Sequence, residues 1–158
     1  MRISISSICF FRDIFPSDCY KNKQYGNVQI HQLQGAQKDE EGEVVVKHKD
    51  AFLLTQWLEK GVFSALEAEY LRSMVFAIYT KHPKTQADLL MESYEFKVSY
   101  AGPGRSAKIN DTELYSKDSV KNQAAKFIRQ LTEFTSTLDE LPSNRWLTVQ
   151  LKVRQYWL

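Results

Sequence analysis

The stretch NRWLTVQLKVRQYWL, residues 144–158, decides how the rest of the chain is interpreted. Apolar and polar residues alternate in its central part, which is the period-two pattern of a half-buried β-strand. The apolar face of this predicted strand consists of Leu147, Val149, Leu151 and Val153. Since a strand lies between neighbours or leaves an edge that needs protection, the sequence raises the question of what pairs with this one.

A long amphipathic helix is predicted immediately before the strand. Asp118 or Ser119 is the expected N-cap, because a short polar side chain accepts hydrogen bonds from the first amides of a helix. Pro142 marks the expected end of the helix. The apolar residues that recur at helical spacing are Val120, Ala124, Phe127, Ile128, Leu131, Phe134 and Leu138.

Two further strands are predicted in the middle of the chain. Residues 71–80 form an almost continuous apolar run, typical of a buried central strand, although periodicity alone also allows a helix. Residues 92–100 alternate clearly, and the short turn around Pro83 predicts that the two strands pair antiparallel. Residues 101–111, rich in glycine and proline, are expected to form a loop. The expected apolar face of the second strand is Tyr94, Phe96, Val98 and Tyr100.

The first part of the chain gives weaker signals. Residues 3–15 carry apolar side chains at three- and four-residue spacings, which predicts a helix that Pro16 ends. A less regular alternation over residues 27–33 predicts a strand, with Leu33 on the face opposite Ile30.

The segment between this strand and the next helix is polar and charged. We expect residues 35–49 to form a mobile charged loop, because they offer too few apolar groups to offset the cost of ordering. Asp50 is the expected N-cap of the following helix, which should end near Tyr70.

The order of the elements predicts an α+β fold with three helices and a mostly antiparallel sheet. The 158 residues are 43% hydrophobic, which is enough for one sizeable core, so one domain over residues 1–158 is expected. The net charge of +2 is too small to indicate a nucleic-acid or membrane-surface protein. No apolar stretch is as long as a membrane span, and we expect a soluble, intracellular protein.

Catalytic and metal-binding patterns do not emerge from the sequence. His31, His48 and His82 are scattered, and surface positions are a simpler interpretation than a site. Cys9 and Cys19 lack metal-type spacing, and free thiols are favoured over a disulfide. We therefore expect no enzyme activity, no metal and no cofactor.

Direct binding to nucleic acid is a weaker interpretation. Basic residues share the predicted long helix and the last strand, but acidic residues are interleaved with them, so an ordinary charged surface is favoured. The basic residues are Lys117, Lys121, Lys126 and Arg129 on the helix, and Lys152 and Arg154 on the strand.

Four segments in order resemble the HORMA domain, and especially the HORMAD/Hop-type proteins of meiotic chromosome axes. Their similar features are an aromatic-rich helix ending in Phe-Pro, a Trp-x-Glu-Lys-Gly-Val stretch, a Glu-Tyr-x-Phe strand and a Leu-Asp-x-x-Pro helix end. Together they cover most of the chain. The segments are ISSICFFRDIFP up to Pro16, WLEKGVFSALEAEYLRSMVFAIY at 57–79, ESYEFKVSY at 92–100, and AAKFIRQLTEFTSTLDELPSNRWLTVQL at 124–151.

The resemblance implies an answer to the question of the last strand. HORMA proteins similar to this one bind a short peptide, the closure motif, in extended form beside the strand equivalent to residues 147–153, and a C-terminal safety belt then wraps over it. Such pairing is β-augmentation. The implied peptide-binding edge is Leu147, Val149, Leu151 and Val153. Compared with the family pattern, the chain lacks the safety belt and begins late in the first helix, so a partial domain, truncated at both ends, is expected.

The resemblance also implies partners and a location. The expected function is that of a meiotic chromosome-axis adaptor in the nucleus, which supports homologue recombination, synapsis and checkpoint signalling. Its expected partners are closure motifs of axis proteins or of its own family, with self-assembly and only indirect association with DNA. FIRQL at 127–131 is similar to a helix face of the spindle-checkpoint member, so Arg129 and Gln130 could serve a HORMA–HORMA interface, against the simpler interpretation of a solvated surface. The alternatives are a spindle-checkpoint, translesion-polymerase or autophagy HORMA adaptor, or a direct nucleic-acid-binding module.

Overall fold

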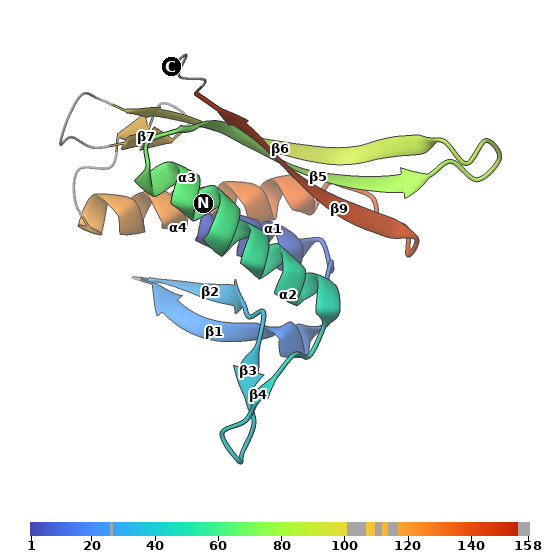
Figure 1. Ribbon diagram of the computed structural model, residues 1–158, viewed down its shortest axis with the longest axis horizontal. Coiled ribbons are helices and arrows are strands. Elements are labelled where there is room, and N and C mark those ends of the chain that lie inside the picture. Colours follow the sequence, from blue (N-terminus) through green and yellow to red (C-terminus); the bar gives the residue numbers. More distant parts are fainter. Residues whose placement is uncertain (26, 101–106, 110–111, 114–116, 155–158) are drawn as a thin grey trace. The chain divides into compact units, whose positions relative to one another are not determined.

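The computed structural model describes residues 1–25, 27–100, 107–109, 112–113 and 117–154 (Figure 1). The chain divides into two compact units, each of which combines two separate segments. The first unit is Met1–Gly61 with Ser116–Asp139, and the second is Val62–Tyr115 with Glu140–Leu158.

Helix α1 (Arg2–Phe11) is central to the first unit. Its side chains Ile5, Ile8 and Cys9 are fully buried. The helix contacts both α4 (Lys117–Thr135) and strand β2 (Val28–Leu33). It is one residue longer at its start than predicted and ends four residues earlier.

Strand β2 pairs antiparallel with β1 (Tyr20–Tyr25), which follows the 3₁₀ turn η1 (Ser17–Cys19). The predicted strand is confirmed. Leu33 and Ile30 are three residues apart in a regular ladder and so lie on opposite faces, and both are buried. The backbone N–H of Leu33 donates to the hydroxyl of Ser6 on α1 at 3.2 Å. Strand β1 was not predicted.

A short antiparallel hairpin, β3 (Gln37–Lys38) and β4 (Val44–Val45), lies within the predicted charged loop. The mobility of residues 35–49 remains a prediction.

Helix α2 (Lys49–Gln56) begins earlier than expected. His48 occupies the N-cap position without a side-chain hydrogen bond, so the prediction that Asp50 is the N-cap was wrong. Asp50 instead lies in the first turn, where a carboxylate is favoured by the helix dipole. A π-helix, η2 (Trp57–Phe63), continues the helix, and the two units adjoin along the chain within it.

The prediction of the long helix α4 is confirmed, with different ends. The helix begins at Lys117, so Asp118 and Ser119 lie inside its first turn, and it ends at Thr135, well before Pro142. The buried stripe is Ala125, Ile128, Leu131 and Thr135. Phe134 is 54% exposed because it is one residue, about 100° of helix rotation, away from the stripe position taken by Thr135. The side chain of Val120 lies outside the described residues.

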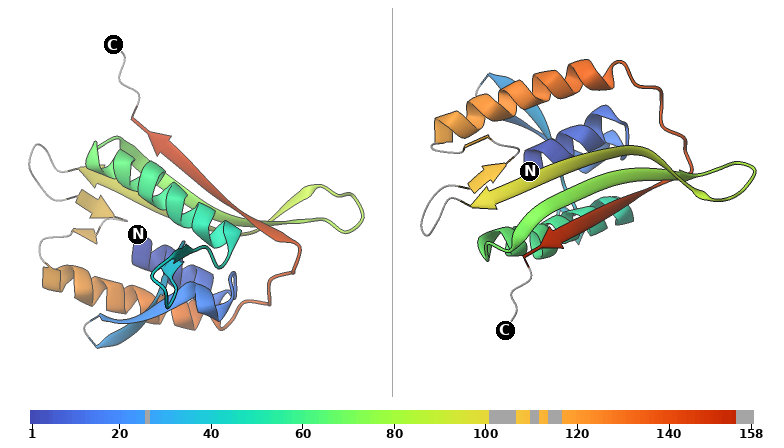
Figure 2. Two further views of the ribbon diagram at one scale, coloured as in Figure 1. Left: turned by 60° about the horizontal axis from the view of Figure 1, so that its bottom comes forward. Right: turned by 90° about the horizontal axis from the view of Figure 1, so that it is seen from above.

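The second unit contains a five-stranded antiparallel sheet in the order β8-β7-β6-β5-β9 (Figure 2). The predicted central strand is confirmed as β5 (Leu71–Lys81), which pairs with β6 (Asp88–Tyr100) on one side and with β9 (Arg145–Val153) on the other. Met74, Phe76 and Ile78 of β5 are fully buried. The short strands β7 (Ala107–Ile109) and β8 (Thr112–Glu113) lie inside the predicted loop of residues 101–111 and just after it.

Helix α3 (Ser64–Glu67) ends three residues before the predicted limit at Tyr70.

Both units contain helices and antiparallel strands, which confirms the α+β prediction. The prediction of a single domain over residues 1–158 stays a prediction.

Candidate peptide-binding edge

Strand β9 is the last strand of the sheet, and its register against β5 fixes which side chains share a face. Leu147 lies opposite Ile78, Val149 opposite Phe76 and Leu151 opposite Met74. Residues directly opposite each other in an antiparallel pair lie on the same face of the sheet. The predicted alternation is therefore confirmed, because the apolar residues of β9 share a face with the fully buried residues of β5.

The exposure of these residues increases along the strand. Leu147 and Val149 are half-buried, Leu151 is 37% exposed and Val153 is 50% exposed. The second half of β9 thus presents apolar side chains to solvent on the side of the sheet that elsewhere forms the core.

The outer side of β9 is an open sheet edge within the described part of the chain, since β5 is the one strand with which β9 pairs there. Alternate residues of such an edge strand direct their N–H and C=O groups away from the sheet. The edge therefore combines backbone groups that can pair with an extended chain and apolar side chains that can contact it. This is the structural requirement for β-augmentation.

Hydrogen bonds hold β9 at both ends. At its start, the hydroxyl of Thr80 on β5 donates to the side-chain oxygen of Asn144 at 2.8 Å. At its end, the backbone N–H of Arg154 donates to the carbonyl oxygen of Tyr70 at 2.8 Å. These two hydrogen bonds attach both ends of β9 to the rest of its unit.

The opposite face of β9 carries an aromatic pair. The rings of Trp146 and Tyr79 stack with centroids 5.9 Å apart and 16° between their planes. The ammonium group of Lys81 lies 5.3 Å from the centre of the Trp146 ring, within the range of a cation–π contact. These contacts stabilise the start of β9 from the face that does not carry the predicted site.

The predicted interface residues Arg129 and Gln130 lie on α4 in the first unit, and both are exposed. Phe134, four residues after Gln130, is exposed as well. Sequence periodicity assigned Phe134 to the core and so missed this apolar surface residue.

The three histidines have structural contacts. The ring of His31 stacks on Phe10 with centroids 3.5 Å apart, and burial lowers the pKa of its imidazole. The Nδ1 atom of His82 accepts the N–H of Thr85 at 3.2 Å in the turn between β5 and β6. His48 packs edge-on against Phe15.

The two cysteines of the chain are buried. Cys9 and Cys19 are buried free thiols, and desolvation raises the pKa of each. Among the residues that the structure describes, no three histidine, cysteine or acidic side chains cluster as metal ligands would. No helix in this part of the chain is long and apolar enough to cross a membrane.

Comparison with protein families defines the class of the protein. The model of the HORMA domain matches residues 1–156, and the chain belongs to this family. HORMA domains are protein-interaction adaptors rather than a known class of enzymes.

The sequence relatives include proteins that are named as meiosis-specific. The chain is 25% identical to the meiosis-specific protein ASY1 of Arabidopsis thaliana, over 96% of this chain and 26% of that protein. It is 28% identical to HORMA domain-containing protein 2 of Bos taurus, over 94% of this chain and 46% of that protein. The chain is 23% identical to the meiosis-specific protein HOP1 of Saccharomyces cerevisiae, over 96% of this chain and 28% of that protein. The chain thus spans a quarter to a half of these relatives.

Solved structures share the fold. The C. elegans protein HTP-2 bound to the HIM-3 closure motif matches with a TM-score of 0.69 and 16% identity, over 96% of this chain and 65% of that chain. A chain of the mitotic checkpoint complex matches with a TM-score of 0.62 and 15% identity, over 98% of this chain and 71% of that chain. The predicted resemblance to the meiotic branch of the family is confirmed by the sequence relatives.

Proposed function

We propose that the protein is an adaptor of meiotic chromosome axes that binds closure-motif peptides along the outer edge of β9. The observation that carries the proposal is the open edge itself, with Leu151 and Val153 exposed beside it. Support comes from the fold neighbour HTP-2, which is bound to a closure motif of HIM-3. The meiotic relatives support the biological setting.

The physical basis is the pairing of an extended peptide with the sheet. Backbone hydrogen bonds to β9 supply affinity that is independent of the peptide sequence, and the apolar side chains of β9 select complementary residues. Leu147, Val149, Leu151 and Val153 are the residues that contact the ligand in this proposal.

A peptide titration tests the site. The probe is a fluorescein-labelled peptide with the closure-motif sequence of HIM-3, measured by fluorescence anisotropy, with further peptides tiled across axis proteins of the source organism. Leu151→Glu places a charge beside the apolar part of the edge and should weaken binding at least about tenfold, since a buried unpaired charge costs more than 1.4 kcal/mol. Gln150→Glu adds the same charge on the opposite face and is the matched control. Equal affinity of wild type and Leu151→Glu for a peptide that binds would refute the assignment.

The cellular part of the proposal is a nuclear location on meiotic chromosomes, with support of homologue recombination, synapsis and checkpoint signalling. Immunofluorescence of the endogenous protein is the direct test. Linear staining along prophase chromosomes is expected. Kinetochore foci or cytoplasmic puncta would instead favour a spindle-checkpoint or autophagy adaptor with the same fold.

A second candidate function is contact between HORMA domains through α4, as in the spindle-checkpoint branch. Exposed Phe134, on the same helix as exposed Arg129 and Gln130, favours it, because a large apolar side chain in solvent is typical of an interface. The match to a chain of the mitotic checkpoint complex is consistent with this candidate. Replacing Arg129 and Gln130 with alanine should then reduce co-purification with a partner HORMA protein while peptide binding at β9 is retained.

A further inference from the structure

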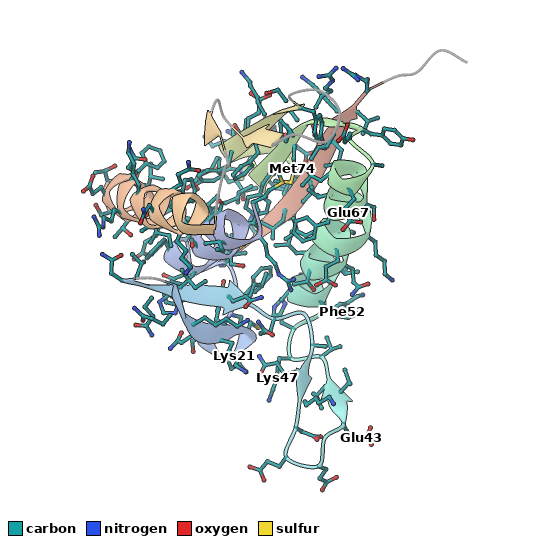
Figure 3. All side chains as sticks on the ribbon, turned by 90° about the vertical axis from the view of Figure 1, so that its left-hand side faces the viewer. Lys21, Glu43, Lys47, Phe52, Glu67 and Met74 are labelled. Carbon is teal, nitrogen blue, oxygen red and sulfur yellow. The ribbon has the colours of Figure 1, made fainter. Side chains whose placement is uncertain are left out.

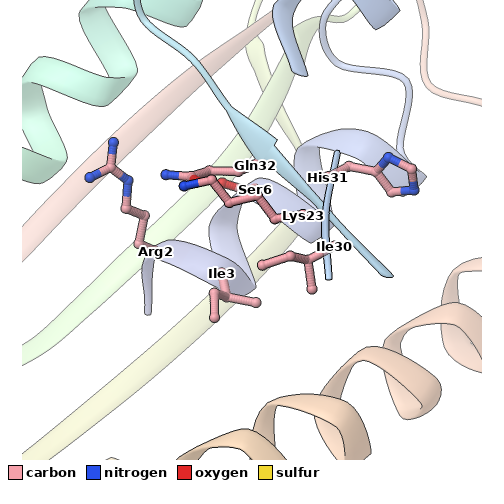
Figure 4. A pocket seen from close by; sticks show the side chains of 7 residues that line it. All are labelled: Arg2, Ile3, Ser6, Lys23, Ile30, His31 and Gln32. Carbon is pink, nitrogen blue, oxygen red and sulfur yellow. The ribbon is translucent and has the colours of Figure 1, made fainter. Parts of the chain in front are cut away.

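The first unit contains an apolar pocket with a basic rim, distinct from the edge of β9. It lies between the start of α1 and the β1–β2 hairpin and has a volume of about 170 Å³ (Figure 4). Ile3 of α1 and Ile30 of β2 contribute apolar walls, and Lys23 of β1 also lines the pocket. An apolar cavity of about 150 Å³ is large enough to hold a benzene ring. The pocket can therefore accept one aliphatic side chain.

The charges around this pocket are positive and incompletely compensated. Lys23 and the nearby Lys21 are exposed, and neither has an acidic partner among the residues that the structure describes. The third basic residue, Arg2, forms an ion pair with Glu59 at 3.0 Å. A ligand for the pocket should therefore combine an aliphatic group with negative charge.

The β3–β4 hairpin has this chemistry. Three successive valines are exposed there, with Val44 at 68%, Val45 at 36% and Val46 at 45%. A two-stranded hairpin without a covering layer leaves both of its faces in water, which explains why residues on alternate sides are all exposed. Three adjacent apolar side chains in solvent are typical of a contact surface.

The turn of the same hairpin is acidic. The carboxylate of Asp39 accepts the backbone N–H groups of Glu41 at 3.0 Å and Glu43 at 2.8 Å, which shapes the turn. Glu40, Glu41 and Glu43 point into solvent without a basic partner among the described residues. Figure 3 shows Glu43 at the end of the projecting hairpin, away from Lys21 of the same unit. The hairpin is thus displayed outward rather than folded onto the pocket of its own chain.

We infer that the protein associates with itself by placing the valine-bearing acidic hairpin of one copy against the basic, apolar pocket of a second copy. Val44 enters the pocket, and the glutamates of the turn lie beside Lys21 and Lys23. The two surfaces are different, so the contact is heterologous, and a dimer held by one such contact retains a free pocket on one copy and a free hairpin on the other. Association therefore extends beyond a dimer as concentration rises. It uses neither β9 nor α4 and is independent of the proposed function.

The test is sedimentation velocity of the full chain over a wide range of concentration. The wild type should show a mass that rises above the 18.4 kDa monomer, and the association should weaken as salt is raised because the rim contacts are exposed ion pairs. Lys23→Glu reverses the charge at the pocket, and Val44→Asp replaces the inserted side chain with a charged one. Each variant alone should remain monomeric. Both positions are exposed, so folding should be retained, which circular dichroism verifies.

A mixture of the two variants gives the decisive result. The Lys23→Glu chain keeps its hairpin and the Val44→Asp chain keeps its pocket, so an equimolar mixture should form a heterodimer and nothing larger. Lys84→Glu, the same charge change in the turn of the second unit, and Leu151→Glu on β9 should both associate like the wild type. The inference is overturned if the wild type stays monomeric, if either Lys23→Glu or Val44→Asp associates normally, if the mixture stays monomeric, or if Leu151→Glu abolishes association.

Discussion

At the scale of single residues, Gly35 occupies a position that no larger residue can take without movement. A Cβ atom built there would lie 1.9 Å from the hydroxyl oxygen of Thr55, 3.0 Å from its Cβ and 3.3 Å from the Cα of Phe52. The Thr55 hydroxyl is itself fixed by donation to the carbonyl oxygen of Phe52 at 2.8 Å. The loop before β3 is therefore packed against α2 at this point, although the sequence around it is polar.

We predict that Gly35→Ala lowers the free energy of unfolding by about 1–3 kcal/mol, because the added methyl group overpacks this contact. Urea denaturation measures the change. The double variant with Thr55→Ala removes the nearest atom and should recover part of the loss, as a double-mutant cycle would reveal. Purely additive losses would show that the two residues do not interact.

Glu69 has a backbone conformation that favours glycine. Its φ is +58°, and it follows the end of α3 at a position where the N–H of Tyr70 donates to the carbonyl oxygen of Ala65 at 2.9 Å. This is the arrangement of a helix C-terminus closed by a left-handed residue.

Glu69→Gly should raise the free energy of unfolding by about 0.5–1 kcal/mol, since glycine adopts this conformation without steric cost. Glu67→Gly, inside α3, serves as the control and should instead lower stability by a similar amount. Thermal denaturation of both variants separates the two effects, and a destabilised Glu69→Gly would contradict the argument.

At the scale of elements, α1 and the β1–β2 hairpin are joined through His31. Its ring stacks on Phe10, its Nδ1 atom is 2.7 Å from the side-chain oxygen of Asn22, and burial lowers its pKa below the ordinary value of 6.5. The unfolded chain, with the ordinary pKa, binds a proton more readily than the folded chain. Protonation therefore favours unfolding.

The contribution of His31 to stability is complete above pH 6.5 and is lost as the pH falls below that value toward the lowered pKa of the folded state. Urea denaturation at pH 7.5 and pH 5 should give a larger acid-induced loss for the wild type than for His31→Gln, which has no titrating group. The same acid-induced loss in both proteins would exclude this role of His31.

Elements with a strong periodic pattern could be predicted, and those stabilised by their surroundings could not. Strands β5, β6 and β9 were predicted because apolar residues line the core face of each. The apolar residues of β9, the candidate peptide-binding edge, followed from the same alternation. Strand β1 is Tyr-Lys-Asn-Lys-Gln-Tyr, whose four middle residues are polar and exposed, so its strand structure depends on pairing with β2. Pairing with a neighbouring strand leaves no signal in the periodicity of a polar strand such as β1.

The basic-rimmed pocket and Phe134 illustrate the same limit for sites. The pocket residues come from α1, β1 and β2, and periodicity cannot show that Ile3 and Lys23 lie around one cavity. The core assignment of Phe134 was wrong because a helical stripe predicted from sequence is broader than the face that a neighbouring element covers. The run of three valines at residues 44–46 was a usable signal within a polar segment.

At the scale of the whole molecule, stability should be distributed unevenly. The central strand β5 pairs on both sides over nearly its full length. The β3–β4 hairpin has only two residue pairs in its ladder, Gln37 with Val45 and Lys38 with Val44, and its side chains are mostly exposed. Local opening is easiest where few buried contacts hold the backbone.

Hydrogen exchange followed by mass spectrometry should therefore detect the slowest exchange in β5 and the fastest exchange in residues 35–49. This experiment also tests the predicted mobility of that segment. The measurement is made at a concentration low enough to keep the protein monomeric, since self-association would protect the hairpin. Equal protection of the hairpin and β5 in the monomer would contradict the prediction.

The antiparallel ladder between β9 and β5 also has a mechanical consequence. Its register runs from Arg145 opposite Thr80 to Val153 opposite Leu71, so the hydrogen bonds lie across the strand direction along the whole ladder. A force that pulls β9 along its own axis acts on these bonds in shear and must break many of them together. A force that lifts one end away from the sheet breaks them one after another. The β9–β5 ladder thus resists tension along the strand far better than peeling. The direction of the applied force therefore decides how large a force separates β9 from the sheet.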